Sequence, residues 1–535
     1  MEREMTTVRD AVRRLEGLYA EYASPGPAAA VAKQHARNKL TVHERLDLLL
    51  DPAAPRFEVA TFAARGCYGE HGEIRSAGVR VVIGSVSGRL SLVVANDSMV
   101  KSGTWFPLTI KKILRAQEIA LENRLPVIYL VDSGGLFLPL QDGSFPDRDH
   151  AGRIFYNNAR LSAAGVPQIA AVMGPCVAGG AYIPALCDEL LIVRGTGGVF
   201  LAAPHLVKAA IGEVSEIEEL GGADTHAEWS GMADYVDDGE EECLARVRRL
   251  AATWPEPPAT RYPVYPPADP ESAPGALLSL LPSDRTEAYE MRAVLRSVID
   301  ADSWQEYKAR YGRSLLTGTA RLNGRVVGIV ASQRSVSRTA RGEMHIGGVI
   351  YGDAAAKAAR FVVNCNQKGV PLLFFQDVTG FMIGKRAEQG GIIREGAKLV
   401  NAVANSRVPK LTVVVGNSYG AGNYALCGRA YGPRFLLAWP TASIAVMAGD
   451  HAAETMLAIE KSKAGARLTE AEEAEILARV RRRYERTLSP YHAAANLWVD
   501  AVIDPRRTRE TLDLLLAVAC RHDPEEEFKL GVFQV

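Results

Sequence analysis

Short apolar runs and longer helical patterns alternate along the chain, and both recur in the same order in its two halves. The helical patterns include residues 106–124 and 396–407, where apolar positions recur with a helical period. The apolar runs are LPVIYLV (125–131), VPQIAAVM (166–173), VPLLFFQ (370–376) and VPKLTVVV (408–415). Strand, helix and strand at this spacing predict βαβ units on a largely parallel sheet, and therefore an α/β fold.

The repeated order reflects an internal duplication. GPCVAGGAYIPA (174–185) aligns without a gap with GNSYGAGNYALC (416–427), and Asp132 aligns with Asp377 after an earlier pair of runs. Because the period is a whole domain, we expect one fold duplicated and fused. Residues 255–274 hold eight prolines in twenty positions, which suits an extended connector. A boundary near 265 then divides the chain into domains 1–265 and 266–535.

The amino-acid composition limits which classes of partner and site the protein is expected to have. Lys+Arg and Asp+Glu both number 62, which argues against a nucleic acid or an anionic membrane as the main partner. No apolar run approaches the ~18 residues that span a bilayer, and the charged N-terminus lacks the apolar core of a signal peptide. The seven cysteines are scattered without a C-x-x-C motif. We therefore expect reduced thiols, a cytoplasmic protein and no metal site.

Two basic or charged helical segments have open interpretations. Lys101, Lys111 and Lys112 could meet the phosphates of a ligand or lie on a solvent-exposed helix face. Residues 468–488 carry a capping-box spacing, Thr469 with Glu472, and are charged nearly all round. This segment is either a solvated helix or an arm that contacts another subunit.

The duplicated glycine turns carry the candidate chemistry. A strand that enters a helix through small residues brings bare backbone N–H groups close to a ligand, and glycine is needed where a side chain would block that approach. Two such N–H groups at a helix N-terminus favour a developing negative oxygen. Close packing of helix on sheet would also select glycine. The presence of the turn in both halves favours the oxyanion interpretation.

The segment VPQIAAVMGPCVAGGAYIPALCDELLIV (166–193) resembles the crotonase superfamily, in which a glycine loop supplies one N–H of an oxyanion hole for a coenzyme A thioester. The resemblance implies two tandem crotonase-like (ClpP/crotonase) βαβ superhelical domains. The second N–H of the hole maps onto DSGGLF (132–137). Hydratases of the superfamily carry a glutamate where this chain has Tyr182 and Tyr424, and a phenol of pKa ~10 is a poor general base at neutral pH.

From QHARNKLTVHERLDLLLD (34–51) almost to its end, the chain resembles the β (carboxyltransferase) subunit of biotin-dependent acyl-CoA carboxylases. Residues 145–174 and 388–440 look most like the methylcrotonyl-CoA carboxylase branch, which serves leucine degradation. The resemblance implies carboxyl transfer from N-carboxybiotin to an acyl-CoA, with one oxyanion hole for the thioester and one for the biotin ureido oxygen. We assign the thioester hole to the first half and the biotin hole to the second.

Residue by residue, the family's two N–H pairs map onto Gly179 with Gly180 and onto Ala421 with Gly422. The expected substrate-binding residues are Ala178, Ser133, Gly134, Gly135, Tyr182, Gly420, Tyr424 and Ala151. Ala178 and Gly420 are alternatives to the paired donors by a shift of one residue. Ala151 stands where the methylcrotonyl branch typically has phenylalanine, and a small residue there would widen an acyl pocket or reflect a change in packing. We expect a side chain at Gly180 or Gly422 to reduce turnover and to spare folding, provided that each turn tolerates the side chain sterically.

The resemblance also implies partners. The chain lacks a biotin-accepting lysine motif and an ATP-binding glycine loop, so a biotinylated α subunit should carry biotin carboxylase and carrier. A site formed between two subunits, a β6 core and an α6β6 assembly follow from the family. Propionyl-, acetyl-, geranyl- or long-chain acyl-CoA remain alternative substrates. The subunit of a biotin-dependent decarboxylase and a non-catalytic scaffold are alternative functions.

Overall fold

The computed structural model describes residues 7–256, 261–284, 287–464, 468–522, 527–532 and 534. The chain forms two compact units, each built around an eight-stranded sheet. The N-terminal unit consists of Leu18–Ala259 and Ala495–Leu497, and the C-terminal unit of Met1–Gly17, Thr260–Ala494 and Trp498–Val535. The described residues between 253 and 273 contain no helix or strand.

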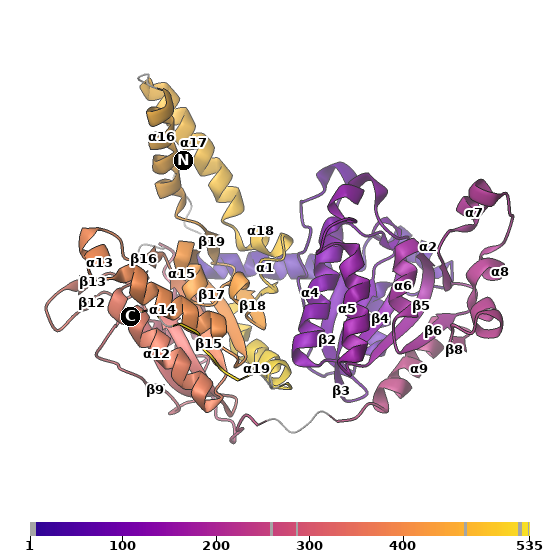
Figure 1. Ribbon diagram of the computed structural model, residues 1–535, viewed down its shortest axis with the longest axis horizontal. Helices are drawn as coiled ribbons and strands as arrows, with labels where there is room; N and C mark the ends of the chain where they lie inside the picture. The colour runs from indigo at the N-terminus through magenta and orange to yellow at the C-terminus, as the bar shows by residue number, and fades with distance from the viewer. Residues whose placement is uncertain are drawn as a thin grey trace. The chain divides into compact units, whose positions relative to one another are not determined.

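The N-terminal unit has the strand order β1-β2-β3-β4-β5-β6-β8, with β7 paired to β5. Helices α4 and α5 lie side by side against this sheet (Figure 1). Apolar residues of α3 and α9 form a core with the inner strands. The strands are β1 (Phe57–Glu58), β2 (Val79–Val86), β3 (Arg89–Asn96), β4 (Val127–Ser133), β5 (Gln168–Val177), β6 (Glu189–Val193), β7 (Gly198–Phe200) and β8 (Tyr235–Asp237). Helix α1 (Val8–Ala23) is divided between the two units after Gly17. The other helices of this unit are α2 (Ala28–His35), α3 (Val42–Leu49), α4 (Pro107–Asn123), α5 (Ala151–Ala163), α6 (Tyr182–Ala185), α7 (Pro204–Ile211), α8 (Ile217–Gly221) and α9 (Glu240–Ala252).

The C-terminal unit repeats this plan with the order β9-β10-β11-β15-β17-β18-β20, and β19 pairs with β17. Helices α12 and α14 pack on its sheet over a second apolar core. The strands are β9 (Gln305–Glu306), β10 (Leu315–Leu322), β11 (Arg325–Ser332), β15 (Leu372–Val378), β17 (Lys410–Tyr419), β18 (Phe435–Ala438), β19 (Ser443–Ala445) and β20 (Ala501–Val502), with the short strands β12 (Ser337–Arg338), β13 (Met344–His345), β14 (Val349–Ile350) and β16 (Gly380–Phe381) outside this sheet. The helices are α10 (Leu277–Leu280), α11 (Met291–Arg296), α12 (Gly352–Lys368), α13 (Lys385–Gln389), α14 (Ile392–Asn405), α15 (Gly420–Ala425), α16 (Gly449–Ala464), α17 (Glu470–Thr487), α18 (Pro490–Ala495) and α19 (Thr508–Ala519).

The duplication extends to the register of the strands. In each unit the first long pair is antiparallel, with Val79 opposite Asn96 and Leu315 opposite Ser332. The following strands are parallel, and each central pair shifts register at one residue, which is Asp132 in β4 and Asp377 in β15. The predicted α/β class and internal duplication are confirmed.

The helix predicted at 468–488 is α17, and its predicted capping box is present at Thr469 and Glu472. It has no buried residue and pairs with α16, and the two form the yellow helical hairpin of the C-terminal unit (Figure 1). The helix predicted at 396–407 begins four residues earlier, at Ile392. A contact between the hairpin and another subunit stays a prediction.

Each unit buries a lysine at the sixth position of the helix that follows its antiparallel pair. These are Lys112 of α4, which is 0% exposed, and Lys357 of α12, which is 1% exposed. The interpretation of Lys112 as a solvent-facing or ligand-facing residue is therefore wrong. Its Nζ atom donates to the backbone oxygen of Ser76 at 3.1 Å and to Ser76 Oγ at 2.9 Å. Burial lowers the pKa of Lys112 to about 7 and that of Lys357 to about 8.

The buried Lys112 should make stability depend on pH. Its folded pKa, about 7, lies below the ordinary 10.5, so between these values the unfolded chain binds a proton that the folded chain does not. The free energy of unfolding should therefore rise with pH across this window, by up to about 1.4 kcal/mol per pH unit. Urea denaturation of the wild type and Lys112→Met measures this as a difference. A difference that stays flat from pH 7 to 10.5 would contradict the assignment, and Lys111→Met is the matched control.

Candidate active site

The first glycine turn follows the central strand of the N-terminal unit. Strand β5 ends at Val177 and enters a single helical turn, Ala178–Ala181, which continues into α6. Ala178 is exposed and adopts φ +56°, a left-handed conformation that alanine rarely takes. Gly179 is half-buried and Gly180 is buried. Gly179 is the second residue of this 3-10 turn, so no intrahelical carbonyl precedes its N–H group to accept it.

The loop after β4 lies against this turn. A Cβ atom at Gly135 would stand 3.3 Å from the backbone oxygen of Val177. The loop's own hydrogen bonds use two of its N–H groups: Gly134 donates to Ser102 O at 3.0 Å, and Gly135 donates to Ser133 Oγ at 3.3 Å. The N–H of Leu136, which the sequence did not single out, has no hydrogen-bond partner among the described residues. Leu136 is thus the loop residue whose N–H is available to a ligand.

Ser133 is buried, and its hydroxyl is hydrogen-bonded to two backbone groups of the protein. Its hydroxyl donates to the backbone oxygen of Gly103 at 2.9 Å while it accepts from Gly135. Burial, with a smaller contribution from the charge of Asp132, raises the pKa of the nearby Cys176 thiol. A buried thiol whose pKa is raised is a poor nucleophile. The groups that the turn offers to a ligand are therefore backbone N–H donors.

Aromatic side chains surround the turn. The Phe155 ring lies 5.6 Å from the ring of Tyr182 and 6.5 Å from that of Trp105, and its Cζ would be 3.5 Å from a Cβ at Gly179. Phe155 belongs to α5, whose first residue is the buried Ala151. Residues four apart share a helix face, so Ala151 lies on the face of α5 that turns toward the glycine turn.

Tyr182 has the geometry of a packing residue. Tyr182 is 47% exposed, and its ring lies against that of Phe155 at 5.6 Å between centroids. We expect Tyr182→Phe to keep most of kcat, since the loss of a true general acid or base would cost about 10²–10⁴. Steady-state kinetics of the intact assembly measure this. A thousandfold loss with the assembly unchanged would assign the phenol a role in proton transfer or orientation.

The second glycine turn repeats the first in the C-terminal unit. Strand β17 enters α15 at Gly420, which takes the left-handed φ of +52° that Ala178 takes in the first turn. Ala421 is exposed and Gly422 is buried. Tyr424 is 48% exposed, and its ring stacks 5.8 Å from that of Tyr431.

The two buried glycines differ in the space around them. A Cβ at Gly180 would lie at ordinary distances, 3.7 Å from Cys176 Sγ and 4.0 Å from Ser133 Oγ. A Cβ at Gly422 would lie 2.7 Å from Cγ2 of Val378, the residue that replaces Ser133 in the second unit. The steric condition attached to the expectation of unchanged stability is therefore met at Gly180 for a Cβ atom and is not met at Gly422. Neither glycine has a left-handed φ, so the difference is purely steric.

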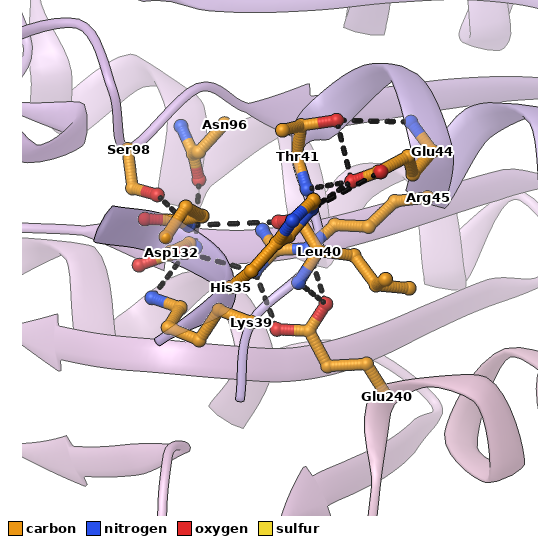
Figure 2. Close-up of polar contacts among 11 residues, drawn as sticks. His35, Lys39, Leu40, Thr41, Glu44, Arg45, Asn96, Ser98, Asp132 and Glu240 are labelled. Atoms are coloured by element: carbon orange, nitrogen blue, oxygen red, sulfur yellow. Dashed lines mark hydrogen bonds and ion pairs between the residues drawn. The ribbon is translucent and has the colours of Figure 1, made fainter. Parts of the chain in front are cut away.

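A buried ion-pair network holds the strand end beside the first turn (Figure 2). Asp132 Oδ2 binds Lys39 Nζ at 2.6 Å and the Arg45 guanidinium at 3.1 Å. Arg45 also forms a bidentate pair with Glu240, at 2.7 and 2.6 Å. Asp132, Arg45 and Glu240 have side chains no more than 3% exposed, and the four charges sum to zero. The sequence showed Asp132 but not its partners, because Glu240 is 195 residues from Arg45.

The carboxylate of Asp132 also explains why residue 174, the first residue of the motif 174–185, is a glycine. A Cβ at Gly174 would lie 1.9 Å from Asp132 Oδ1, so only glycine fits there. The second unit repeats this contact between Asp377 and Gly416. Asp377 is held by other partners, since Tyr289 donates to it at 2.8 Å and the N–H of Asn417 at 2.9 Å.

The described residues contain no group of three or more His, Cys, Asp or Glu side chains placed to hold a metal ion. In the same part of the chain, no helix has the length and apolar character needed to cross a membrane.

Comparison with known proteins agrees with the duplicated architecture. Residues 33–529 match the model of the carboxyl transferase domain. The chain is 46% identical over 530 residues to the biotin-dependent 3-methylcrotonyl-coenzyme A carboxylase beta1 subunit of Mycobacterium tuberculosis, covering 98% of this chain and 97% of the relative. It is 44% identical over 502 residues to the mitochondrial methylcrotonoyl-CoA carboxylase beta chain of Dictyostelium discoideum, covering 92% and 82%.

Among solved structures, the beta subunit of P. aeruginosa geranyl-CoA carboxylase superposes with a TM-score of 0.85 at 34% identity. The superposition covers 99% of this chain and 96% of that subunit. The predicted crotonase-like class and the predicted resemblance are confirmed. The chain belongs to the carboxyl transferase family.

Proposed function

We propose that this chain is the carboxyltransferase subunit of a biotin-dependent acyl-CoA carboxylase, with 3-methylcrotonyl-CoA as its substrate. The observation that carries the proposal is the pair of glycine turns, each placed at the end of the central strand of its unit. The proposal also draws on the relatives named as methylcrotonyl-CoA carboxylase beta subunits at 46% and 44% identity.

The backbone donors fit this chemistry. In the N-terminal unit, the N–H groups of Gly179 or Gly180 and of Leu136 bind the thioester oxygen as it becomes an enolate oxygen. In the C-terminal unit, the N–H groups of Ala421 and Gly422 bind the ureido oxygen of biotin. Carboxybiotin bound there would supply both the CO2 and, at its ureido nitrogen, the acceptor for the proton that the acyl-CoA loses. Loss of a proton from a γ-methyl group of 3-methylcrotonyl-CoA would give a dienolate, whose carbon forms the new bond to CO2, so the chain itself needs no general base.

Other residues have positioning roles in this proposal. Ala178 and Gly420 set the left-handed entry of each turn, and Ser133, Gly134 and Gly135 shape the loop that presents Leu136. Tyr182 and Tyr424 flank the turns. Ala151, on the α5 face near the first turn, stands where the methylcrotonyl branch has phenylalanine, and in this proposal it leaves room for the branched methyl groups of the acyl chain.

The partners follow from the family. The chain acts with a biotinylated α subunit that carries biotin carboxylase and the biotin carrier, in the cytoplasm, within an α6β6 assembly built on a β6 core. The thioester side belongs to residues 1–265 and the carboxybiotin side to 266–535. Ligands of this chain are then an acyl-CoA and a biotin that arrives on its partner.

The test is a substrate panel with the reconstituted holoenzyme. We expect kcat/KM for 3-methylcrotonyl-CoA to exceed that for geranyl-, propionyl-, acetyl- and long-chain acyl-CoA by about tenfold or more, since one methylene in an apolar pocket is worth about 1–3 kcal/mol. The chain without its α subunit should fix no bicarbonate from ATP. Bicarbonate fixation by the isolated chain would refute the assignment to a carboxyltransferase subunit, and a higher kcat/KM for another acyl-CoA would refute the substrate.

A further inference from the structure

The C-terminal unit holds a basic cavity that is open to solvent. None of its lining residues has a role in the proposed carboxyl transfer. Its volume is about 490 Å³, and its lining consists of Lys308, Arg310, Tyr311, Ala356, Lys357 and Arg360. Four of the six lining residues are cations and none is acidic. Among the described residues, none of the four cations forms an ion pair, in a chain whose total charges balance at 62 of each sign.

Comparison of the two units shows why Lys357 lacks a partner. Lys112, its equivalent in the first unit, is held by Ser76, which lies three residues before β2 with φ +51°. Gly312 lies three residues before β10 with φ +55°, and so occupies the place of that serine. A Cβ at Gly312 would lie 2.7 Å from the Cα of Ala354, so this position excludes the serine side chain. The Nζ atom of Lys357 is buried without a hydrogen-bond partner.

The nearby carboxylates do not replace that partner. Glu306 is engaged by Arg292, at 2.8 and 2.7 Å, and Asp353 accepts the N–H of Ala354 at 2.8 Å. Lys308 is positioned by aromatic rings, with its Nζ atom 5.5 Å from the ring centre of Tyr307 and 5.6 Å from that of Tyr311. A buried ammonium without a partner costs free energy that an anion would recover.

We infer that this cavity binds a phosphate group, with Lys357 as the buried contact and Arg310, Arg360 and Lys308 as the outer contacts. Guanidinium groups bind phosphate oxygens in pairs, and ammonium groups supply a compact charge. The phosphate could belong to coenzyme A or to a free phosphate ligand. Phosphate binding needs no turnover, so it can be measured whether or not the chain catalyses carboxyl transfer.

The experiment is calorimetric titration of the full-length protein with inorganic phosphate, pyrophosphate, coenzyme A and 3′-dephospho-coenzyme A at constant ionic strength. We expect Lys357→Met and Arg360→Gln each to weaken binding of at least one probe by about tenfold or more, because each removes a charge-assisted hydrogen bond. Lys461→Met is the matched control, since it removes one charge that is paired with Glu473 and lies outside the cavity lining.

The outcomes separate the sources of the phosphate. Weaker binding of coenzyme A than of pyrophosphate would support a free ligand. A loss specific to the 3′-phosphate, with a raised KM for acyl-CoA and unchanged kcat in the variants, would support coenzyme A. If Lys357→Met lowers the melting temperature, binding is instead compared between the wild type and variants of Arg360 and Arg310, because these two residues are exposed and their replacement should not disturb folding. Unchanged affinity for all four probes in the folded variants would overturn the inference.

Discussion

Gly180→Val is expected to lower kcat by at least about a hundredfold and to leave the melting temperature nearly unchanged. A Cβ at Gly180 meets Cys176, Trp105 and Ser133 only at ordinary contact distances, so a side chain is expected to strain this turn less than it strains the second turn. The branched methyl groups then cover the N–H group that the proposed mechanism uses. Loss of one oxyanion donor costs about 10²–10³ in kcat, which is roughly 2.7–4 kcal/mol. Steady-state kinetics of the holoenzyme beside thermal denaturation measure both quantities.

Gly422→Val is the informative comparison. Its Cβ would overlap Val378, so we expect both activity and melting temperature to fall. Gly17→Val is the control, because a Cβ at this exposed helical position meets no atom within 4 Å. If Gly180→Val instead unfolds the protein without a selective loss of turnover, the glycine serves packing, and the oxyanion assignment loses its main support.

Arg45→Met is expected to lower the free energy of unfolding of the N-terminal unit by about 3–5 kcal/mol. The substitution leaves the buried carboxylates of Asp132 and Glu240 with Lys39 as their only cation in the network. Removing one member of a buried ion network costs this much because a charge remains without compensation. Hydrogen exchange of the β4 and β5 amides reports the opening of this unit.

Two further variants test whether the cost of Arg45→Met comes from the buried ion-pair network. Arg56 pairs with Asp47 at 2.9 Å, but both side chains are at least 60% exposed, so Arg56→Met should cost less than about 1 kcal/mol. The double variant Arg45→Met, Glu240→Gln should recover part of the loss, since it removes one unpaired charge. A cost for Arg45→Met as small as that for Arg56→Met would show that the network does not hold the strand end.

Periodic patterns allowed much of the fold to be predicted. The alternation of apolar runs and helical segments predicted β4, β5, β15 and β17, and the unbroken alignment of the two halves predicted two equivalent sheets. The capping box at Thr469 located the start of α17 to one residue. Such signals are local, since they depend on which residues share one face of an element or end it.

The details of the two glycine turns could not be predicted from the sequence, because they depend on contacts between segments that are far apart in the chain. The alignment placed both glycine turns, but only the structure shows that Ser133 leaves room at Gly180 while Val378 fills the same space at Gly422. Leu136 could not be identified as a donor, because the identity of a leucine side chain does not indicate whether its backbone N–H group is hydrogen-bonded. Lys112 looked like a surface residue, because a lysine's burial depends on a partner 36 residues away.

The contact between Asp132 and Gly174 also restricts how related sequences can diverge. An alanine at 174 would occupy the space of the Asp132 carboxylate, and a change at 132 would leave Lys39 and Arg45 without their shared counter-ion. These positions can therefore change only together. In an alignment of relatives they should covary as one block, and Asp377 should covary with Gly416 as a second block. The ancestral half-length gene would then have carried the aspartate–glycine pair before duplication, and each copy acquired its own cations or hydroxyls around it afterwards.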